Sequence, residues 1–133
     1  MKAKEKLYIA SCSFGKDSIA TVLLALENKE PLDKVVFSEV IYDRERGISG
    51  EHPEHIKWVY EVAIPKLESM GVKVDVVRHP ERDYLYYFNH RRTRGKNIGK
   101  KNGFPIGGMC DITKLKTVPI REYLKQFEDY DVI

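Results

Sequence analysis

Residues 7–18 read LYIASCSFGKDS, and this stretch decides the fold of the chain. Leu7 to Ser13 is a short run rich in strand-forming residues, and Phe14-Gly15 supplies a turn. From Asp17 the apolar residues recur at helical spacing, which predicts an amphipathic helix to about Lys29. The stretch therefore predicts a strand, a tight glycine-containing loop and a helix.

The same alternation continues down the chain. Lys34 to Tyr42 (KVVFSEVIY) predicts a second strand, Asp43 to His52 a polar loop, and Val72 to Arg78 (VKVDVVR) a third strand. The connections are long enough for parallel crossovers. We therefore expect an α/β fold over residues 1–133, with one open, mostly parallel sheet and helices on both faces.

Prolines and glycines mark the other helices. Pro53 is placed to begin a helix, Pro65 should kink or divide it, and Gly71 should end it. A short helix is expected at 84–88, and Pro119 is expected to open a last one. The predicted buried face of the helix after Pro53 consists of Ile56, Val59, Tyr60, Ala63, Leu67 and Met70.

The composition limits the class of protein. The 133 residues suffice for one domain, and no apolar run approaches the roughly 18 residues of a membrane span. The short apolar stretch near the N-terminus fits a first strand better than a signal peptide, so we expect a cytoplasmic protein without a membrane partner. The four histidines lack metal-binding spacing, so neither zinc nor haem is expected.

Positive charge is concentrated in one glycine-rich loop at about 89–109. No carboxylate occurs between Asp83 and Asp111, whereas six cations do, and without them the net charge of +3 becomes −3. The six cations are Arg91, Arg92, Arg94, Lys96, Lys100 and Lys101. Three interpretations stay open. The arginines fold over phosphates, the loop is solvated and mobile, or it binds nucleic acid beside the aromatic run 84–88. The mild overall charge argues against the last.

The turn after the first strand has the chemistry of a phosphate site. Backbone N–H groups at a helix N-terminus attract anions, and Gly15 lets the backbone approach without a Cβ in the way. Ser13 and Ser18 add hydroxyl donors, and Lys16 is a cation that could reach a phosphate. Asp17 is expected to cap the helix or hold magnesium. The alternative is an ordinary polar turn between a strand and a helix.

The segment Ser13-Phe14-Gly15-Lys16-Asp17-Ser18 resembles the S-[GF]-G-x-[DE]-S loop of the PP-loop superfamily, also called adenine nucleotide alpha hydrolase-like. Its Phe is most similar to the phosphoadenosine phosphosulfate (PAPS) reductase family. Asp43 and Glu51 stand where that family often has acids. Residues 110–119 (CDITKLKTVP) resemble its C-T-x-x-L-K-x-x-P element.

This resemblance implies a nucleotide site for ATP or PAPS, and many members of the superfamily cleave ATP between the α- and β-phosphates. It implies that the loop from Ser13 to Ser18 holds the phosphates and that Lys16 and Asp17 take part in catalysis. The base would lie over the strand ends near Ala10, Ser11 and Phe37. Magnesium would be held by Asp17 or Asp43. Arg91, Arg92 and Arg94 would help to cover the nucleotide.

Two departures from the family limit this interpretation. The reductases use a Cys in a C-terminal E-C-G-L-H tail, which is not found here, so PAPS reduction by this chain alone is not expected. Cys12 is expected to be a small buried residue, and Cys110 to be structural, with a reactive thiol as the alternative. The chain also ends early for the family, with Asp131 to Ile133 at the start of a further strand.

The early end leaves several explanations open. The chain is a natural short form, a fragment, or is completed by a partner or a second copy at the exposed sheet edge. The function expected first is adenine-nucleotide binding, with ATP cleavage for sulfur or nucleotidyl transfer. The alternatives are a non-catalytic module that binds nucleotide or nucleic acid, and a sulfur-transfer component that acts on tRNA or DNA.

Overall fold

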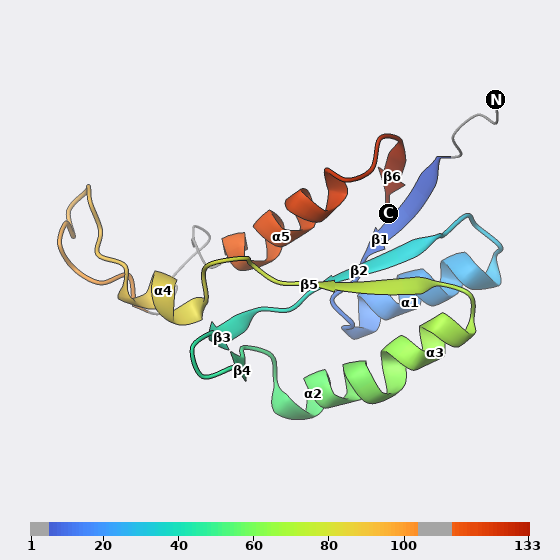
Figure 1. Ribbon diagram of the computed structural model, residues 1–133, viewed down its shortest axis with the longest axis horizontal. Coiled ribbons are helices and arrows are strands. Elements are labelled where there is room, and N and C mark those ends of the chain that lie inside the picture. The colour runs from blue at the N-terminus through green and yellow to red at the C-terminus, as the bar shows by residue number, and fades with distance from the viewer. Residues whose placement is uncertain (1–5, 104–112) are drawn as a thin grey trace.

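A four-stranded parallel sheet forms the centre of the protein. The computed structural model describes residues 6–103 and 113–133 (Figure 1). The strands are β1 (Leu7–Ser11), β2 (Lys34–Ser38), β5 (Lys73–Val77) and β6 (Tyr130–Val132). Their order is β5-β2-β1-β6, and every pair is parallel. The predicted α/β class, the parallel sheet and the strand at the C-terminal end are confirmed.

Helices cover both faces of this sheet. α1 (Lys16–Glu27) and the run α2 (Pro53–Trp58), η1 (Val59–Ala63) and α3 (Ile64–Ser69) lie on one face, and α5 (Lys114–Leu124) lies on the other (Figure 1). Alternate residues of β2 point to opposite faces of the sheet, and each face has its own hydrophobic core. Val35 and Phe37 pack on the side of α1 and α3, whereas Val36 packs with Tyr123 of α5. Among the described residues, no helix is long and apolar enough to cross a membrane.

The helix after Pro53 is divided, as the sequence predicted. A π-helical turn, η1, precedes Pro65, and Gly71 closes the segment at a φ of +92°. Val59, Ala63 and Leu67 form the buried face, but Tyr60 and Met70 are 40% and 44% exposed, so their predicted burial is wrong. A π-turn holds more residues than an α-turn, and this shifts the inward stripe to a strict four-residue spacing.

The second predicted strand is too long. β2 ends at Ser38, and the chain then leaves the sheet to form β3 (Ile41–Asp43), which pairs antiparallel with β4 (Ile48–Ser49). The segment 43–52 is therefore not wholly a loop. The Gly50 N–H donates to the Val40 carbonyl at 2.7 Å and closes this hairpin. Propensity along KVVFSEVIY could not show that the two halves pair with different partners.

The last helix begins earlier than the sequence predicted. α5 starts at Lys114 and contains Pro119 in its interior. Proline has no N–H, so the Leu115 carbonyl loses the helical donor that residue 119 would normally supply. The buried Ser38 hydroxyl at the end of β2 donates to that carbonyl instead, at 3.4 Å. A contact with the sheet thus compensates for a proline inside the helix.

We predict that Ser38→Ala lowers the free energy of unfolding by about 1 kcal/mol, because a buried carbonyl loses its donor. In a Pro119→Ala background, the new backbone N–H at position 119 can donate to the Leu115 carbonyl. There Ser38→Ala should lower the free energy of unfolding by less than about half of its effect in the parent protein. Urea unfolding of the four proteins in this cycle measures both values. An equal cost of Ser38→Ala in the two backgrounds would contradict the compensation.

Candidate functional site

The loop between β1 and α1 lies at the point where the strand order of the sheet reverses. β2 pairs with β1 on one side and β6, the last strand of the chain, pairs with it on the other. In open α/β sheets, ligands bind outside the carboxyl ends of the strands at such a switch point. Ser11 ends β1 with its side chain exposed, and residues 12–15 continue from it into α1 (Figure 1).

Phe14 holds the loop against the core. Its ring is 2% exposed and meets the Phe37 ring edge-on at a centroid distance of 5.3 Å. Phe14 also has a φ of +61°, which is uncommon for a bulky residue and costs energy. The Phe14 N–H donates to the Sγ of Cys12 at 3.4 Å. Cys12 itself is buried, as predicted. Burial of the ring thus fixes a strained backbone.

The next residue, Gly15, adopts an extended conformation and caps the start of α1. Its φ is −72° and its ψ is 167°, so its backbone does not itself require glycine. A Cβ at this position would meet only the Ser13 Oγ, at 3.6 Å. The fold has room for alanine here. If glycine is needed here, the reason is a group other than the described residues, such as a bound ligand.

Polar groups converge at this end of α1. The hydroxyls of Ser13 and Ser18 lie 3.1 Å apart, and Ser18 donates to the Gly15 carbonyl at 3.1 Å. No side chain caps the helix, so its first N–H groups have no side-chain acceptor from the cap residue. With the positive end of the helix dipole behind them, these groups favour an anion. Lys16 and Asp17 are exposed beside them.

Of the two predicted magnesium ligands, only Asp17 lies on the loop. Asp43 ends β3, is 8% exposed, and is engaged by Arg46: its Oδ1 accepts from the Arg46 N–H at 3.3 Å, and its Oδ2 lies 3.7 Å from Nε. The described residues contain no group of three or more His, Cys, Asp or Glu side chains that could hold a metal. The magnesium site stays a prediction.

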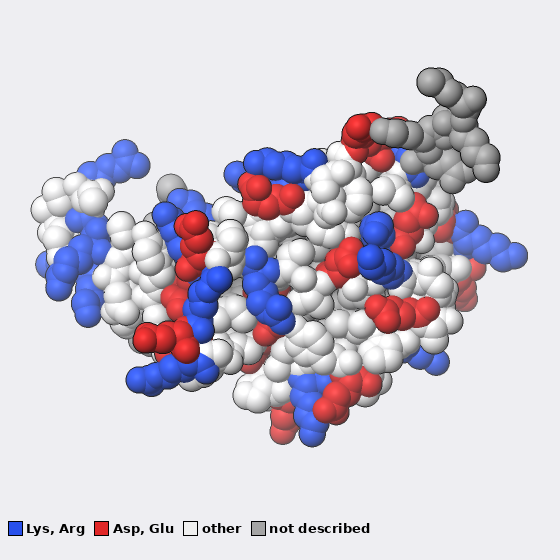
Figure 2. Space-filling model, viewed as in Figure 1, with Lys and Arg blue, Asp and Glu red and all other residues white. Residues whose placement is uncertain are grey.

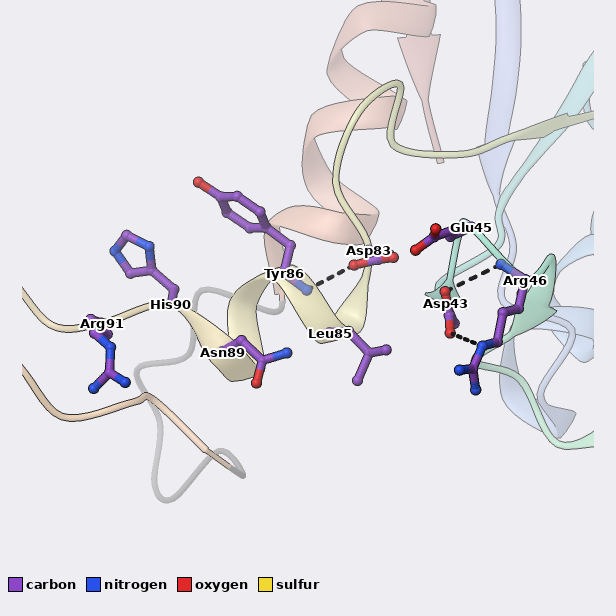
Figure 3. A pocket seen from close by; sticks show the side chains of 9 residues that line it. All are labelled: Asp43, Glu45, Arg46, Asp83, Leu85, Tyr86, Asn89, His90 and Arg91. Atoms are coloured by element: carbon purple, nitrogen blue, oxygen red, sulfur yellow. Dashed lines mark hydrogen bonds and ion pairs between the residues drawn. The ribbon is translucent and has the colours of Figure 1, made fainter.

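Asp43 and Arg91 line opposite ends of another feature, a pocket of about 780 Å³ between the β3–β4 hairpin and α4 (Tyr84–Asn89) (Figure 3). Asp83 joins the two elements, since it accepts from the Tyr86 N–H at 2.7 Å and from the Arg44 N–H at 2.8 Å. The lining residues are Asp43, Glu45, Arg46, Asp83, Leu85, Tyr86, Asn89, His90 and Arg91. None of these belongs to the β1–α1 loop.

The arginines of the basic loop are not brought to the β1–α1 loop. Residues 91–101 are all exposed, and the segment projects beyond α4, away from the sheet (Figure 1). Arg91 lines the pocket, whereas Arg92 and Arg94 do not. The end of the predicted basic loop, 104–109, and the segment 110–112 that begins with Cys110 lie outside the described residues.

An ion pair at the same edge of the sheet, between the buried Glu39 and the half-exposed Arg78, was missed by the sequence analysis. Glu39 follows β2, Arg78 follows β5, and the Arg78 Nη2 donates to the Glu39 Oε1 at 2.8 Å. The Tyr60 hydroxyl donates to the same oxygen at 2.5 Å. A charge directly after each apolar strand was the available signal, but only strand pairing shows that the two meet.

This cluster shifts the ionisation of its members. Burial raises the pKa of the Glu39 carboxyl, but hydrogen bonds from Tyr60, Ser49 and Arg78 outweigh burial and bring that pKa below its ordinary value of 4.5. Burial and the nearby Glu39 raise the pKa of Tyr60 to about 12. At neutral pH the cluster is therefore a carboxylate held by a guanidinium and a neutral phenol.

Since the folded-state pKa of Glu39 is lowered, its contribution to stability is present above 4.5 and is lost as the pH falls through the folded value. We predict that Glu39→Gln lowers the free energy of unfolding by about 1–3 kcal/mol at pH 7. The difference from the parent protein should shrink steadily below pH 4.5. Urea unfolding at several pH values measures it, with the exposed Glu61→Gln as the matched control. A difference that does not change with pH would contradict the assignment.

Comparisons with known proteins add no relative. No protein-family model, no curated protein and no solved structure matches the chain.

Proposed function

We propose that the β1–α1 loop binds the phosphates of an adenine nucleotide, ATP or PAPS. The observation that carries the proposal is the position of this loop. It follows β1 at the switch point of a parallel sheet, with the N-terminus of the 12-residue helix α1 behind it. The choice of an adenine nucleotide rests on the resemblance of residues 13–18 to the PP-loop.

Each residue of the loop has a distinct task in this proposal. Phe14 anchors the backbone, and Gly15 leaves open the space beside the first N–H groups of α1. The hydroxyls of Ser13 and Ser18, which now face each other, turn to donate to the phosphates. Lys16 neutralises charge on the outer phosphates and on the leaving group.

The base would lie over the ends of the strands near Ser11. Phe37 is 1% exposed, so it would act from beneath, by supporting Phe14 rather than by touching the base. Magnesium in proteins is commonly bound by one or two carboxylates together with substrate phosphates. Asp17 is exposed at the loop and fits this role, whereas Asp43 is engaged by Arg46. When bound, the metal would polarise the phosphoryl oxygens.

With ATP bound in this way, the chain could support nucleotidyl transfer: an acceptor atom of a second substrate bonds to the α-phosphorus, the bond to the oxygen that bridges the α- and β-phosphates breaks, and pyrophosphate leaves. The nucleotidylated acceptor would then be activated for sulfur transfer. In that reaction the loop keeps the pyrophosphate in place while Lys16 offsets the charge that develops on it. Asp17 is the second residue that we assign to catalysis, through the metal.

We predict that the parent protein binds ATP or PAPS and that Gly15→Ala weakens binding at least about tenfold, because the methyl group occupies space beside the phosphates. The variant should fold at least as stably as the parent, since its Cβ meets only the Ser13 Oγ at 3.6 Å. Isothermal calorimetry measures affinity, and urea unfolding measures stability.

Two variants, each of which removes one lysine charge, refine this test. Lys16→Gln should weaken binding about tenfold or more through loss of a charge-assisted contact. Lys57→Gln removes another exposed lysine, from α2, and should leave affinity unchanged. If the parent binds neither nucleotide, or if Gly15→Ala binds as tightly as the parent, the proposal is wrong.

A further inference from the structure

The basic segment after α4 is a built hairpin. Arg91 and Lys101 form an antiparallel bridge, the Arg92 N–H donates to the Lys100 carbonyl at 2.9 Å, and the Gly99 N–H donates back to Arg92 at 2.8 Å. The Arg91 guanidinium also donates to the Gly99 carbonyl at 2.9 Å. We call residues 90–102 the basic hairpin. Its backbone hydrogen bonds define the segment from which its cations project.

Within the part of the chain that the structure describes, no carboxylate neutralises the positive charge of the basic hairpin. All six of its cations are exposed, and within 6–103 and 113–133 no carboxylate forms an ion pair with any of them. Figure 2 shows Lys and Arg side chains along the projecting loop. A cluster of this kind, held away from the body of the protein, favours a polyanionic partner.

Planar side chains line the base of the basic hairpin. The Arg82 guanidinium lies 4.6 Å from the centroid of the Tyr86 ring, and Tyr86 stacks on His90 at 6.0 Å with an interplanar angle of 27°. Tyr86 is 43% exposed, and His90 is exposed and adjoins Arg91. Stacked groups next to cations provide both parts of a single-strand site, one for the bases and one for the phosphates.

The pocket between α4 and the β3–β4 hairpin offers a polyanion less positive charge than the basic hairpin does. Asp43, Glu45 and Asp83 line it together with Arg46, which pairs with Asp43, and Tyr86, His90 and Arg91 line it as well (Figure 3). Three carboxylates thus accompany two arginines there, and carboxylates repel phosphates. A polyanion is therefore expected to follow the basic hairpin.

From these observations we propose that the basic hairpin and the Tyr86–His90 stack form a docking surface for single-stranded nucleic acid. The exposed cations contact consecutive phosphates, and one or two bases extend the stack at His90. A duplex would supply the phosphates but keep its base faces hidden, and an acidic protein would lack bases for the stack. The surface shares no residue with the β1–α1 loop.

The test measures the binding of a fluorescent single-stranded RNA or DNA of about 20 nucleotides, longer than the roughly 4–16 that a single-strand groove covers, at several salt concentrations. With up to six phosphates contacted, the slope of log K against log salt should reach about −4. Replacing Arg91, Arg92 and Arg94 by Gln should reduce that slope by about 2 units and weaken binding at least about tenfold.

Two matched variants separate this site from bulk charge and from the nucleotide loop. A control triple variant replaces Lys57, Lys66 and Arg121 by Gln; these residues are exposed on α2, α3 and α5. It removes as much positive charge as the arginine variant does, and it should leave the affinity for the strand nearly unchanged. Gly15→Ala should bind the strand as well as the parent does. A failure of the loop to bind nucleotide can therefore be distinguished from a failure of the basic hairpin to bind the strand.

A third variant tests the stack. Tyr86→Leu removes the ring on which His90 stacks, so His90 is no longer held in place for the base that extends the stack. Because base stacking contributes about 1–3 kcal/mol per base, binding of the single strand should weaken about fivefold or more, and duplex binding should stay unchanged. The proposal is overturned if the single strand does not bind at low salt, or if the control triple variant loses as much as the arginine variant. The proposal is also overturned if duplex or poly-glutamate binds as tightly as the single strand and Tyr86→Leu does not change the affinity for the single strand.

Discussion

The contact between Phe14 and Phe37 determines the conformation of the loop around which the rest of the site is arranged. Phe14 occupies a left-handed backbone conformation that a bulky residue normally avoids, and its buried ring offsets that cost. Because the ring points into the core, the chain reverses at this residue and Gly15 can start α1 from an extended conformation. The N-terminus of the helix is then directed toward the switch point of the sheet.

Several polar groups at the carboxyl edge of the sheet form contacts that join one structural element to another. Glu39 and Arg78 join β2 to β5, and Ser38 donates to the carbonyl that Pro119 leaves without a helical partner. Asp83 connects the β3–β4 hairpin with α4. These contacts tie neighbouring elements together at the edge, whereas the first turn of α1 and the basic hairpin present exposed polar groups to solvent.

Those two surfaces differ in the chemistry that they offer. The loop presents backbone N–H groups, two hydroxyls and one lysine within a single turn, which suits a compact phosphate group. The basic hairpin presents six cations along an extended segment beside stacked rings, which suits a longer polyanion. Their independence means that each can be tested in a protein in which the other is intact.

Local pattern in the sequence determined the strands at 7–11, 34–38 and 73–77, the division of the helix at Pro65 and its end at Gly71, because propensity, proline and glycine act within a few residues. Only tertiary structure decided that the second predicted strand divides, that Pro119 lies inside α5, that Glu39 meets Arg78, and that the basic hairpin projects away from the β1–α1 loop. Each of these depends on a partner distant in the chain, whether a donor, an opposite charge or a paired strand, and spacing along one segment carries no information about that partner.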